Sequence, residues 1–187
     1  MATAPEQIRT EHLSLSCWQQ ADAEELRATL DRCDAHLRPW IPFMKHEPRT
    51  LEQTRQGLVA NRESFAKGEH HRFAIRELAS KALVGETMLL LRGGPNTLEA
   101  GYWLDQQYCG KGYASEATAA LLPIAFETLG AERVILRCDQ RNVASVRVAE
   151  RLDGICCDIE KIEENGEAVT LLVFECRRPS AGGDPAQ

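Results

Sequence analysis

The chain has 187 residues, of which 43% are hydrophobic and 27% charged, and its formal net charge at pH 7 is −6. These values are typical of a globular protein with one domain and a substantial core. The acidic balance argues against bulk binding of nucleic acid. No apolar run reaches the roughly 20 residues that span a bilayer, and residues 1–7 lack the core of a signal peptide. We therefore expect a cytoplasmic protein without a membrane partner.

The seven cysteines contain no C-x-x-C pair, and the five histidines show no spacing that would complete a zinc site. We expect no bound metal. An odd number of cysteines suits reduced thiols, which behave as small core residues. This interpretation applies to all of them except Cys109, which lies in a polar loop.

Hydrophobic periodicity predicts an alternation of strands and helices along the chain. The expected strands are 12–18, 72–77, 82–92, 98–104 and 133–138, and the expected helices are 21–37, 50–67, 113–129 and 143–152. Thr50 is the expected N-cap of the second helix, Gly68 follows its end, and Pro123 should kink the third. A closing hairpin should turn at Asn165-Gly166.

This order predicts an α/β fold in which a single mixed, mostly antiparallel central sheet carries helices on both faces. It contains one β-α-β crossover, from 98–104 through 113–129 to 133–138. The ends are small, polar and rich in proline or glycine. We therefore place the domain at 8–178 and expect flexible termini at 1–7 and 179–187.

The segment 107–114 (QYCGKGYA) joins an expected strand to an expected helix. Its two glycines permit a backbone on which successive N–H groups converge, and the helix start adds unpaired N–H groups and a positive dipole end. Such a loop is a candidate cradle for a phosphate. A nucleotide P-loop would need Ser or Thr after Lys111, and a dinucleotide fingerprint would need glycine in place of Ser115. Simple turn geometry remains an alternative for this loop taken alone.

The same loop matches the pattern Gln/Arg-x-x-Gly-x-Gly/Ala through Gln107, Gly110 and Gly112. Here the chain resembles the GNAT superfamily of acyl-CoA-dependent N-acyltransferases, and within it the branch that acetylates the N-terminal serine of a ribosomal protein. The resemblance covers roughly residues 10–177. It also rests on the segments 37–42 (LRPWIP), 101–104 (GYWL), 112–117 (GYASEA), 129–134 (LGAERV) and 142–149 (NVASVRVA).

The resemblance implies acetyl-CoA as the cofactor. The loop amides would hold its pyrophosphate, Lys111 would add positive charge, and strand 98–104 would splay from the next strand to admit the pantetheine arm. The residues implied in cofactor binding are Trp103, Leu104, Gln107, Tyr108, Cys109, Gly110, Lys111, Gly112, Tyr113, Ala114 and Asn142.

For the general base, the resemblance favours Glu99, which precedes Gly101-Tyr102-Trp103 on the strand that feeds the loop. The competing interpretation is a glutamate that simply faces solvent. The rival bases are Glu86, Glu160, Glu163 and Glu164.

Many members of the family use a tyrosine as the general acid, and its position is Ala149 in this chain. Ser145 is the remaining candidate, implied by the ribosomal-protein branch. The alternative is that Asn142 and Ser145 only organise the start of their helix. Tyr102 is interpreted as a packing residue, and Cys109 is given no covalent role.

Trp40 and Phe43 lie between the first two helices and are the candidate acceptor-binding residues. The alternative is a hydrophobic plug that joins the two helices. The expected reaction is acetyl transfer to a primary amine, such as a protein N-terminus. A small-molecule amine, another acyl donor such as succinyl-CoA, and a non-catalytic acyl-CoA sensor remain open. The resemblance also makes a homodimer possible.

Overall fold

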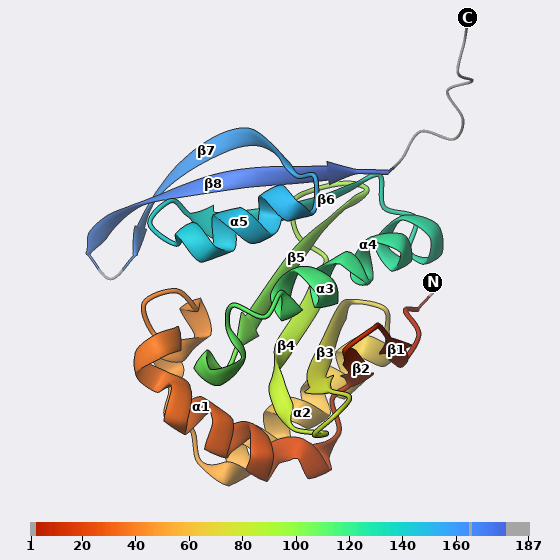
Figure 1. Ribbon diagram of the computed structural model, residues 1–187, viewed down its shortest axis with the longest axis vertical. Helices are drawn as coiled ribbons and strands as arrows, with labels where there is room; N and C mark the ends of the chain where they lie inside the picture. Colours follow the sequence, from red (N-terminus) through yellow and green to blue (C-terminus); the bar gives the residue numbers. More distant parts are fainter. Residues whose placement is uncertain (1–2, 165, 179–187) are drawn as a thin grey trace, which may run out of the picture.

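The structure is a computed structural model that describes residues 3–164 and 166–178 (Figure 1). In this part of the chain, one 8-stranded sheet has the order β1-β2-β3-β4-β5-β6-β8-β7. The strands are β1 (Gln7–Arg9), β2 (Leu13–Cys17), β3 (His70–Glu77), β4 (Leu83–Leu90), β5 (Thr97–Leu104), β6 (Arg133–Asp139), β7 (Ile155–Glu164) and β8 (Glu167–Arg177). Neighbouring strands are antiparallel except β5 and β6, which are parallel. The predicted mostly antiparallel α/β fold is therefore confirmed.

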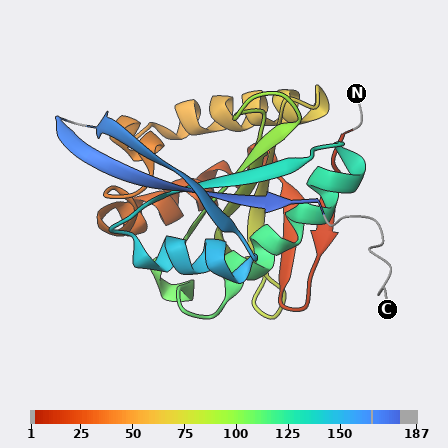
Figure 2. The same ribbon diagram turned by 90° about the horizontal axis from the view of Figure 1, so that it is seen from above.

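Helices cover both faces of the sheet. They are α1 (Ala23–Leu37), α2 (Leu51–Ala66), α3 (Tyr113–Ala119), α4 (Leu121–Pro123) and α5 (Val143–Arg151), with short turns η1 (Gln20–Asp22), η2 (Pro42–His46), η3 (Gln106–Tyr108) and η4 (Ile124–Thr128). Seen from above, α2 lies on one side of the sheet, and α3, α4 and α5 lie on the other (Figure 2). The side chain of Trp103 on β5 packs against α1 residues such as Leu30 and Leu37.

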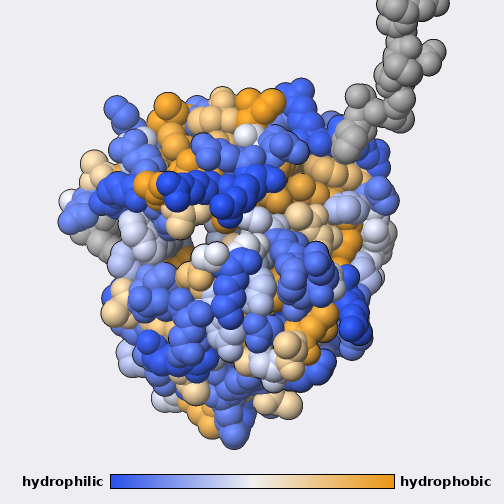
Figure 3. Space-filling model, in the orientation of Figure 1, coloured by the Kyte–Doolittle hydropathy of each residue, from blue (hydrophilic) through white to orange (hydrophobic). Residues whose placement is uncertain are grey.

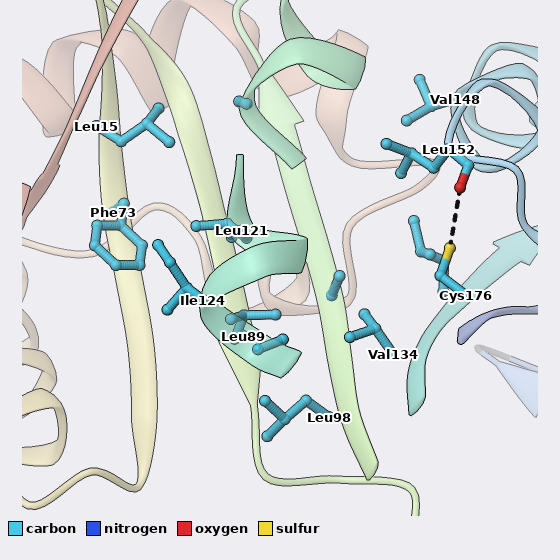
Figure 4. Packing of buried hydrophobic residues seen from close by; sticks show 14 of the residues in the cluster. Leu15, Phe73, Leu89, Leu98, Leu121, Ile124, Val134, Val148, Leu152 and Cys176 are labelled. Carbon is cyan, nitrogen blue, oxygen red and sulfur yellow. Dashed lines mark hydrogen bonds between the residues drawn. The ribbon is translucent and has the colours of Figure 1, made fainter. Parts of the chain in front are cut away.

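The main hydrophobic core lies between the sheet and the layer of α3, α4 and α5. Figure 4 shows Leu121 and Ile124 directed towards Phe73 and Leu89 of the sheet. Leu15 of β2 belongs to the same cluster and is fully buried. Burial of this apolar surface, at about 25 cal/mol per Å² removed from water, stabilises the layer that carries the loop between β5 and α3.

Several local predictions are confirmed. Thr50 caps α2 through a reciprocal pair with Gln53, in which the Thr50 Oγ1 accepts from the Gln53 N–H at 3.2 Å and the Gln53 Oε1 accepts from the Thr50 N–H at 2.9 Å. Gly68 follows the helix with φ +73°. Pro123, which has no N–H to donate, marks the end of the regular helix, and a π-type turn follows. β7 and β8 form the closing hairpin with Glu164 opposite Glu167, although Asn165 lies outside the described residues.

A strand precedes the first one that the sequence predicts, and it begins at Gln7, inside the segment for which no regular structure was expected. Gln7 is the first residue of β1 and pairs with Ser16 of β2. The Glu6 carbonyl accepts from the Cys17 N–H at 2.8 Å, and Ala4 is buried. The strand was missed because Gln7-Ile8-Arg9 has a single apolar residue, which gives no readable alternation.

The two parallel strands separate after a short ladder, and this divergence leaves an opening in the sheet. β5 and β6 pair only at Thr97–Arg133, Leu98–Val134 and Glu99–Ile135. Beyond Glu99, β5 stays paired with β4, and β6 stays paired with β8 as far as Asp139. We call the opening between 100–104 of β5 and 136–139 of β6 the fork. Its backbone edges are available to a ligand, because neither strand fills the other's hydrogen-bonding positions.

A bulge in β4 shapes one arm of the fork. The register between β3 and β4 shifts after Ile75, and Gly85 has φ +156°. A Cβ added at Gly85 would lie 2.1 Å from the Trp103 carbonyl oxygen and 3.0 Å from the Leu104 Cα. Only glycine therefore lets β4 approach the end of β5 this closely.

We predict that Gly85→Ala lowers the free energy of unfolding by about 1–3 kcal/mol, because the backbone of β5 must shift to relieve the contact. Gly57→Ala is the matched control, since Gly57 lies inside α2 and an added Cβ meets only the Arg49 Nη1, at 3.8 Å. That control should stabilise the protein by roughly 0.5–1 kcal/mol. Urea unfolding of both variants tests the pair, and equal stability for them would contradict the assignment of the bulge.

Candidate active site

The loop from β5 to α3 carries glycines with positive φ where the sequence places them. Gly110 has φ +79° and Gly112, the N-cap of α3, has φ +85°. No atom lies within 4 Å of a Cβ added at either position. The glycines are therefore required by backbone conformation, and open space lies beside them.

Unpaired amides line this loop. In residues 3–164 and 166–178, the N–H groups from Gly110 to Ser115 have no hydrogen-bond acceptor. Together with the positive end of the α3 dipole, such a run of donors favours an anion. The loop thus fits the predicted phosphate cradle.

Lys111, Tyr108 and Tyr113 form one cluster beside these amides. The Lys111 Nζ lies 4.8 Å from the Tyr108 ring centroid, 5.6 Å from that of Tyr113, and 3.6 Å from the Glu77 Oε1. The Tyr113 hydroxyl donates to the same Glu77 oxygen at 2.7 Å, a bond that raises the pKa of Tyr113 to about 12. The ammonium group of Lys111 is thus held next to the exposed glycines.

Asp105 fixes the beginning of the loop. Its Oδ1 accepts from the Gln107 N–H at 3.0 Å, and its Oδ2 accepts from Arg32 of α1 at 2.7 Å. Asp105 is 1% exposed. Burial alone would raise the pKa of its carboxyl, but the Gln107 amide and Arg32 outweigh that effect and lower it. The loop is therefore tied both to its own backbone and to α1.

On the other arm of the fork, Asn142 caps α5. Its Oδ1 accepts from the Ser145 N–H at 3.1 Å, so it has the helix-organising role that the sequence left open. The Ser145 Oγ lies 3.0 Å from the Tyr102 hydroxyl of β5 and 3.3 Å from the Cys138 Sγ of β6. Ser145 thus joins both arms of the fork. Tyr102, interpreted as a packing residue from the sequence, has its hydroxyl in this site.

Glu99 lies on the opposite face of the fork, because side chains alternate along β5 and three positions separate it from Tyr102. Its Oε2 accepts from the Arg137 Nη1 of β6 at 2.6 Å. The Nε of Arg137 donates to Glu160 of β7 at 2.9 Å. The pKa of Arg137 is raised, foremost by Glu160 and also by Glu99. The structure therefore connects Glu99 and the rival Glu160 through one guanidinium, which the sequence analysis missed.

Among the other rival bases, Glu86 is buried and fully engaged. It accepts from the indole N–H groups of Trp18 and Trp103, both at 2.9 Å, and from Arg72 at 3.3 Å. These bonds give it a structural role in holding Trp103. Glu163 is exposed on β7, and the side chain of Glu164 lies outside the described residues.

The segment between α1 and α2 lies on the Glu99 face. Phe43 packs against the cluster that contains Trp103 and Met44, whereas Trp40 is 37% exposed. Figure 3 shows a hollow between the half of the molecule that carries α5, β7 and β8 and the half that carries α1. Both candidate residues thus come from an element on the Glu99 face of the fork.

The expectation that the cysteines are reduced core residues is met by some of them. All seven are free, and Cys17, Cys33, Cys138 and Cys176 are buried. The core interpretation is wrong for Cys156 and Cys157, which are exposed on edge strand β7. Cys109 is exposed, with its Sγ 3.6 Å from the His36 Nε2, and partial burial of the thiol raises its pKa. A raised pKa disfavours the nucleophilic thiolate.

No group of three or more His, Cys, Asp or Glu side chains in the described part of the chain is arranged to hold a metal ion. None of the helices in that part is both long and apolar enough to cross a membrane.

Comparison with known proteins identifies the family. Residues 12–154 match the acetyltransferase (GNAT) domain model. The probable N-acetyltransferase YjcK of Bacillus subtilis is 32% identical over 104 residues, which are 54% of this chain and 58% of that relative. The match thus spans little more than half the length of YjcK.

Two solved structures share the fold. A candidate ribosomal-protein-serine acetyltransferase from Vibrio cholerae is 27% identical with a TM-score of 0.75, over 94% of this chain and 99% of the other. The ribosomal L7/L12 α-N-protein acetyltransferase RimL, in complex with coenzyme A through a cysteine disulfide, is 21% identical with a TM-score of 0.82, over 92% and 98%.

This chain belongs to the GNAT acetyltransferase family. The prediction from the sequence is therefore confirmed for the family, whose members are acetyltransferases. Two structures with this fold, RimL and the microcin C7 self-immunity acetyltransferase MccE, contain coenzyme A and acetyl-CoA respectively. The fork, the cradle loop and the capped start of α5 are the parts of this chain that fit such a donor.

We predict that Asp105→Asn loosens the cradle loop, raises the KM for acetyl-CoA several-fold and lowers the free energy of unfolding at pH 7 by about 1–3 kcal/mol. The pKa of Asp105 is lowered on folding from 3.8, so the carboxylate stabilises the protein above that pH. This contribution is lost as the pH falls towards the folded-state pKa, and the variant and the wild type should then converge.

The control is Asp31→Asn, which removes the charge of an exposed carboxylate paired with Arg27 of α1. Arg27 keeps its other partner, Glu47, so stability should change by less than about 1 kcal/mol. Chemical unfolding at several pH values makes the comparison. A stability difference between wild type and Asp105→Asn that stays constant down to pH 3 would contradict the assignment.

Proposed function

We propose that this protein transfers an acetyl group from acetyl-CoA directly to a primary amine, with the N-terminal amino group of a protein as the favoured acceptor. The observation that carries the proposal is the fork, because its two faces separate the chemical groups that such a transfer needs. Ser145 lies on one face with Tyr102, and Glu99 lies on the other with Arg137.

Acetyl-CoA supplies the activated thioester when bound. The unpaired N–H groups from Gly110 to Ser115 and the ammonium of Lys111 suit its pyrophosphate. The unpaired edge of β5 near Trp103 and Leu104 suits the pantetheine arm, which carries amide donors and acceptors. Asn142 keeps its amide NH₂ available, since only its Oδ1 is used in capping.

The transfer also needs side chains that accept one proton and donate another. The amine must lose one proton as the new C–N bond forms, and the sulfur must gain one as the C–S bond breaks. Glu99 is the proposed base, on the face next to Phe43 and Trp103, and the Ser145 hydroxyl is the proposed donor towards the sulfur. Glu160 shares Arg137 with Glu99 and is the alternative base.

The acceptor preference follows from the pKa of the amine. The charges of Glu99 and Glu160 are balanced by Arg137 and by Arg92, whose Nη1 lies 3.9 Å from the Glu99 Oε1, so the charge of this face does not select the acceptor. An α-amino group has a pKa near 7.7–8.0 and is partly neutral at pH 7, whereas a lysine near 10.4 needs a far stronger base. The α-amino group therefore needs less help from a base than a lysine does. We also expect a cytoplasmic protein that acts as a homodimer.

The test compares acetyl-CoA turnover on a panel of N-terminal peptides, lysine side-chain peptides, polyamines and aminoglycosides. We expect turnover on the peptides with a free α-amino group. Turnover on small amines alone would show that the acceptor is a small molecule and not a protein N-terminus. No turnover on any acceptor would support a non-catalytic acyl-CoA sensor.

Two substitutions test the proposed chemistry. Glu99→Gln should lower kcat by about 10²-fold and Ser145→Ala by about tenfold, both with the KM for acetyl-CoA changed by less than roughly threefold. Glu24→Gln is the control, since Glu24 is an exposed glutamate paired with Arg55 far from the fork. Full activity in Glu99→Gln would exclude it as the base and favour Glu160.

A further inference from the structure

We propose that Tyr102 is a positioning residue for the proton donor, and that its hydroxyl holds the Ser145 hydroxyl in the orientation that serves the leaving sulfur. The inference deepens the proposed function and rests on it. It begins from a three-member chain that crosses the fork, from Tyr102 of β5 through Ser145 of α5 to Cys138 of β6.

Counting the protons fixes the direction of this chain. The Ser145 Oγ donates to the Cys138 Sγ at 3.3 Å. A serine hydroxyl has one proton and two lone pairs, so Ser145 cannot also donate to Tyr102. The Tyr102 hydroxyl, 3.0 Å away, must therefore be the donor to the Ser145 Oγ. The order of donation is Tyr102 to Ser145 to sulfur.

This order has a chemical consequence. A hydroxyl that accepts a hydrogen bond from one side directs its own proton to another partner and becomes a stronger donor, because hydrogen bonds in a chain polarise one another. In this structure the Ser145 proton is directed at the Cys138 Sγ. To serve the leaving sulfur, the Ser145 hydroxyl must turn its one proton away from Cys138, while the bond from the Tyr102 hydroxyl keeps the Ser145 Oγ in place.

Tyr102 keeps its proton throughout the working pH range. Burial is the main cause that raises the pKa of its phenol, so the hydroxyl stays neutral and remains a donor. Its ring packs against the main core, which fixes the direction of the hydroxyl. Tyr102 thus supplies a hydroxyl from a strand, in a chain where the family's usual tyrosine position on the helix is Ala149.

The reaction balances without a proton from Tyr102. The amine nitrogen forms a bond to the acetyl carbon and loses one proton to the base, while the carbon–sulfur bond breaks and the Ser145 hydroxyl gives its proton to the sulfur. The base then releases its proton to water and Ser145 takes one proton back from water, so the protein gains and loses none. Tyr102 keeps its own proton and only restrains Ser145. Its removal should therefore lower kcat and leave acetyl-CoA binding largely intact.

The experiment is a double-mutant cycle of Tyr102→Phe and Ser145→Ala, with kcat and the KM for acetyl-CoA measured for each protein. Tyr102→Phe keeps the ring and removes one donor, so we expect kcat to fall about tenfold and the KM to change by less than about twofold. In the Ser145→Ala background, Tyr102→Phe should change kcat by less than about twofold, because it then has no hydroxyl to orient.

Thr54→Val is the matched control. It removes another buried hydroxyl, which bonds to the Thr50 carbonyl inside α2, and it should leave kcat unchanged. A wild-type kcat in Tyr102→Phe would overturn this inference and leave the proposed function standing. So would an equal loss with and without Ser145, since Tyr102 would then act through packing. If the wild type turns over no amine, the proposed function falls and this inference falls with it.

Discussion

The structure depends on the point where β5 and β6 stop pairing. Two parallel strands that share a ladder only from Thr97 to Glu99 must diverge, because each remains bound to its other neighbour. The opening is therefore built into the sheet and needs no moving lid. The bulge at Gly85 sets one arm, and the bond between Tyr102 and Ser145 spans the gap at the α5 face.

Because side chains alternate along the strands, the polar groups of β5 and β6 are divided between the two faces of the fork. Neighbouring residues of β6, Arg137 and Cys138, belong to opposite faces, as do Glu99 and Tyr102 of β5. Carboxylates and the guanidinium gather on the face of α1 and its following loop, whereas hydroxyls and a thiol gather on the face of α5. A group placed between the strands would have proton acceptors on one side and hydroxyl donors on the other.

Sequence reasoning located what depends on local conformation. The positive φ of Gly110 and Gly112, the cap at Thr50 and the end of regular α-helix at Pro123 each follow from the chemistry of one residue type, and each is present. Contacts that depend on strand register could not be predicted from the sequence. Tyr102 reads as an aromatic core residue until β5 and α5 are placed side by side, and Arg137 reads as a surface arginine until Glu99 and Glu160 lie beside it.

The measurement that tests the central claim most directly is thermal unfolding with acetyl-CoA, coenzyme A, succinyl-CoA and NAD, each far above micromolar concentration. A ligand that binds only the folded state stabilises it by about 2.7 kcal/mol at 100 times its Kd, which for a chain of this size raises the Tm by roughly 5–10 °C. If the fork and cradle hold an acyl-CoA, the coenzyme A species should produce this shift and NAD should not. A shift with NAD alone, or with none of the four, would contradict the account.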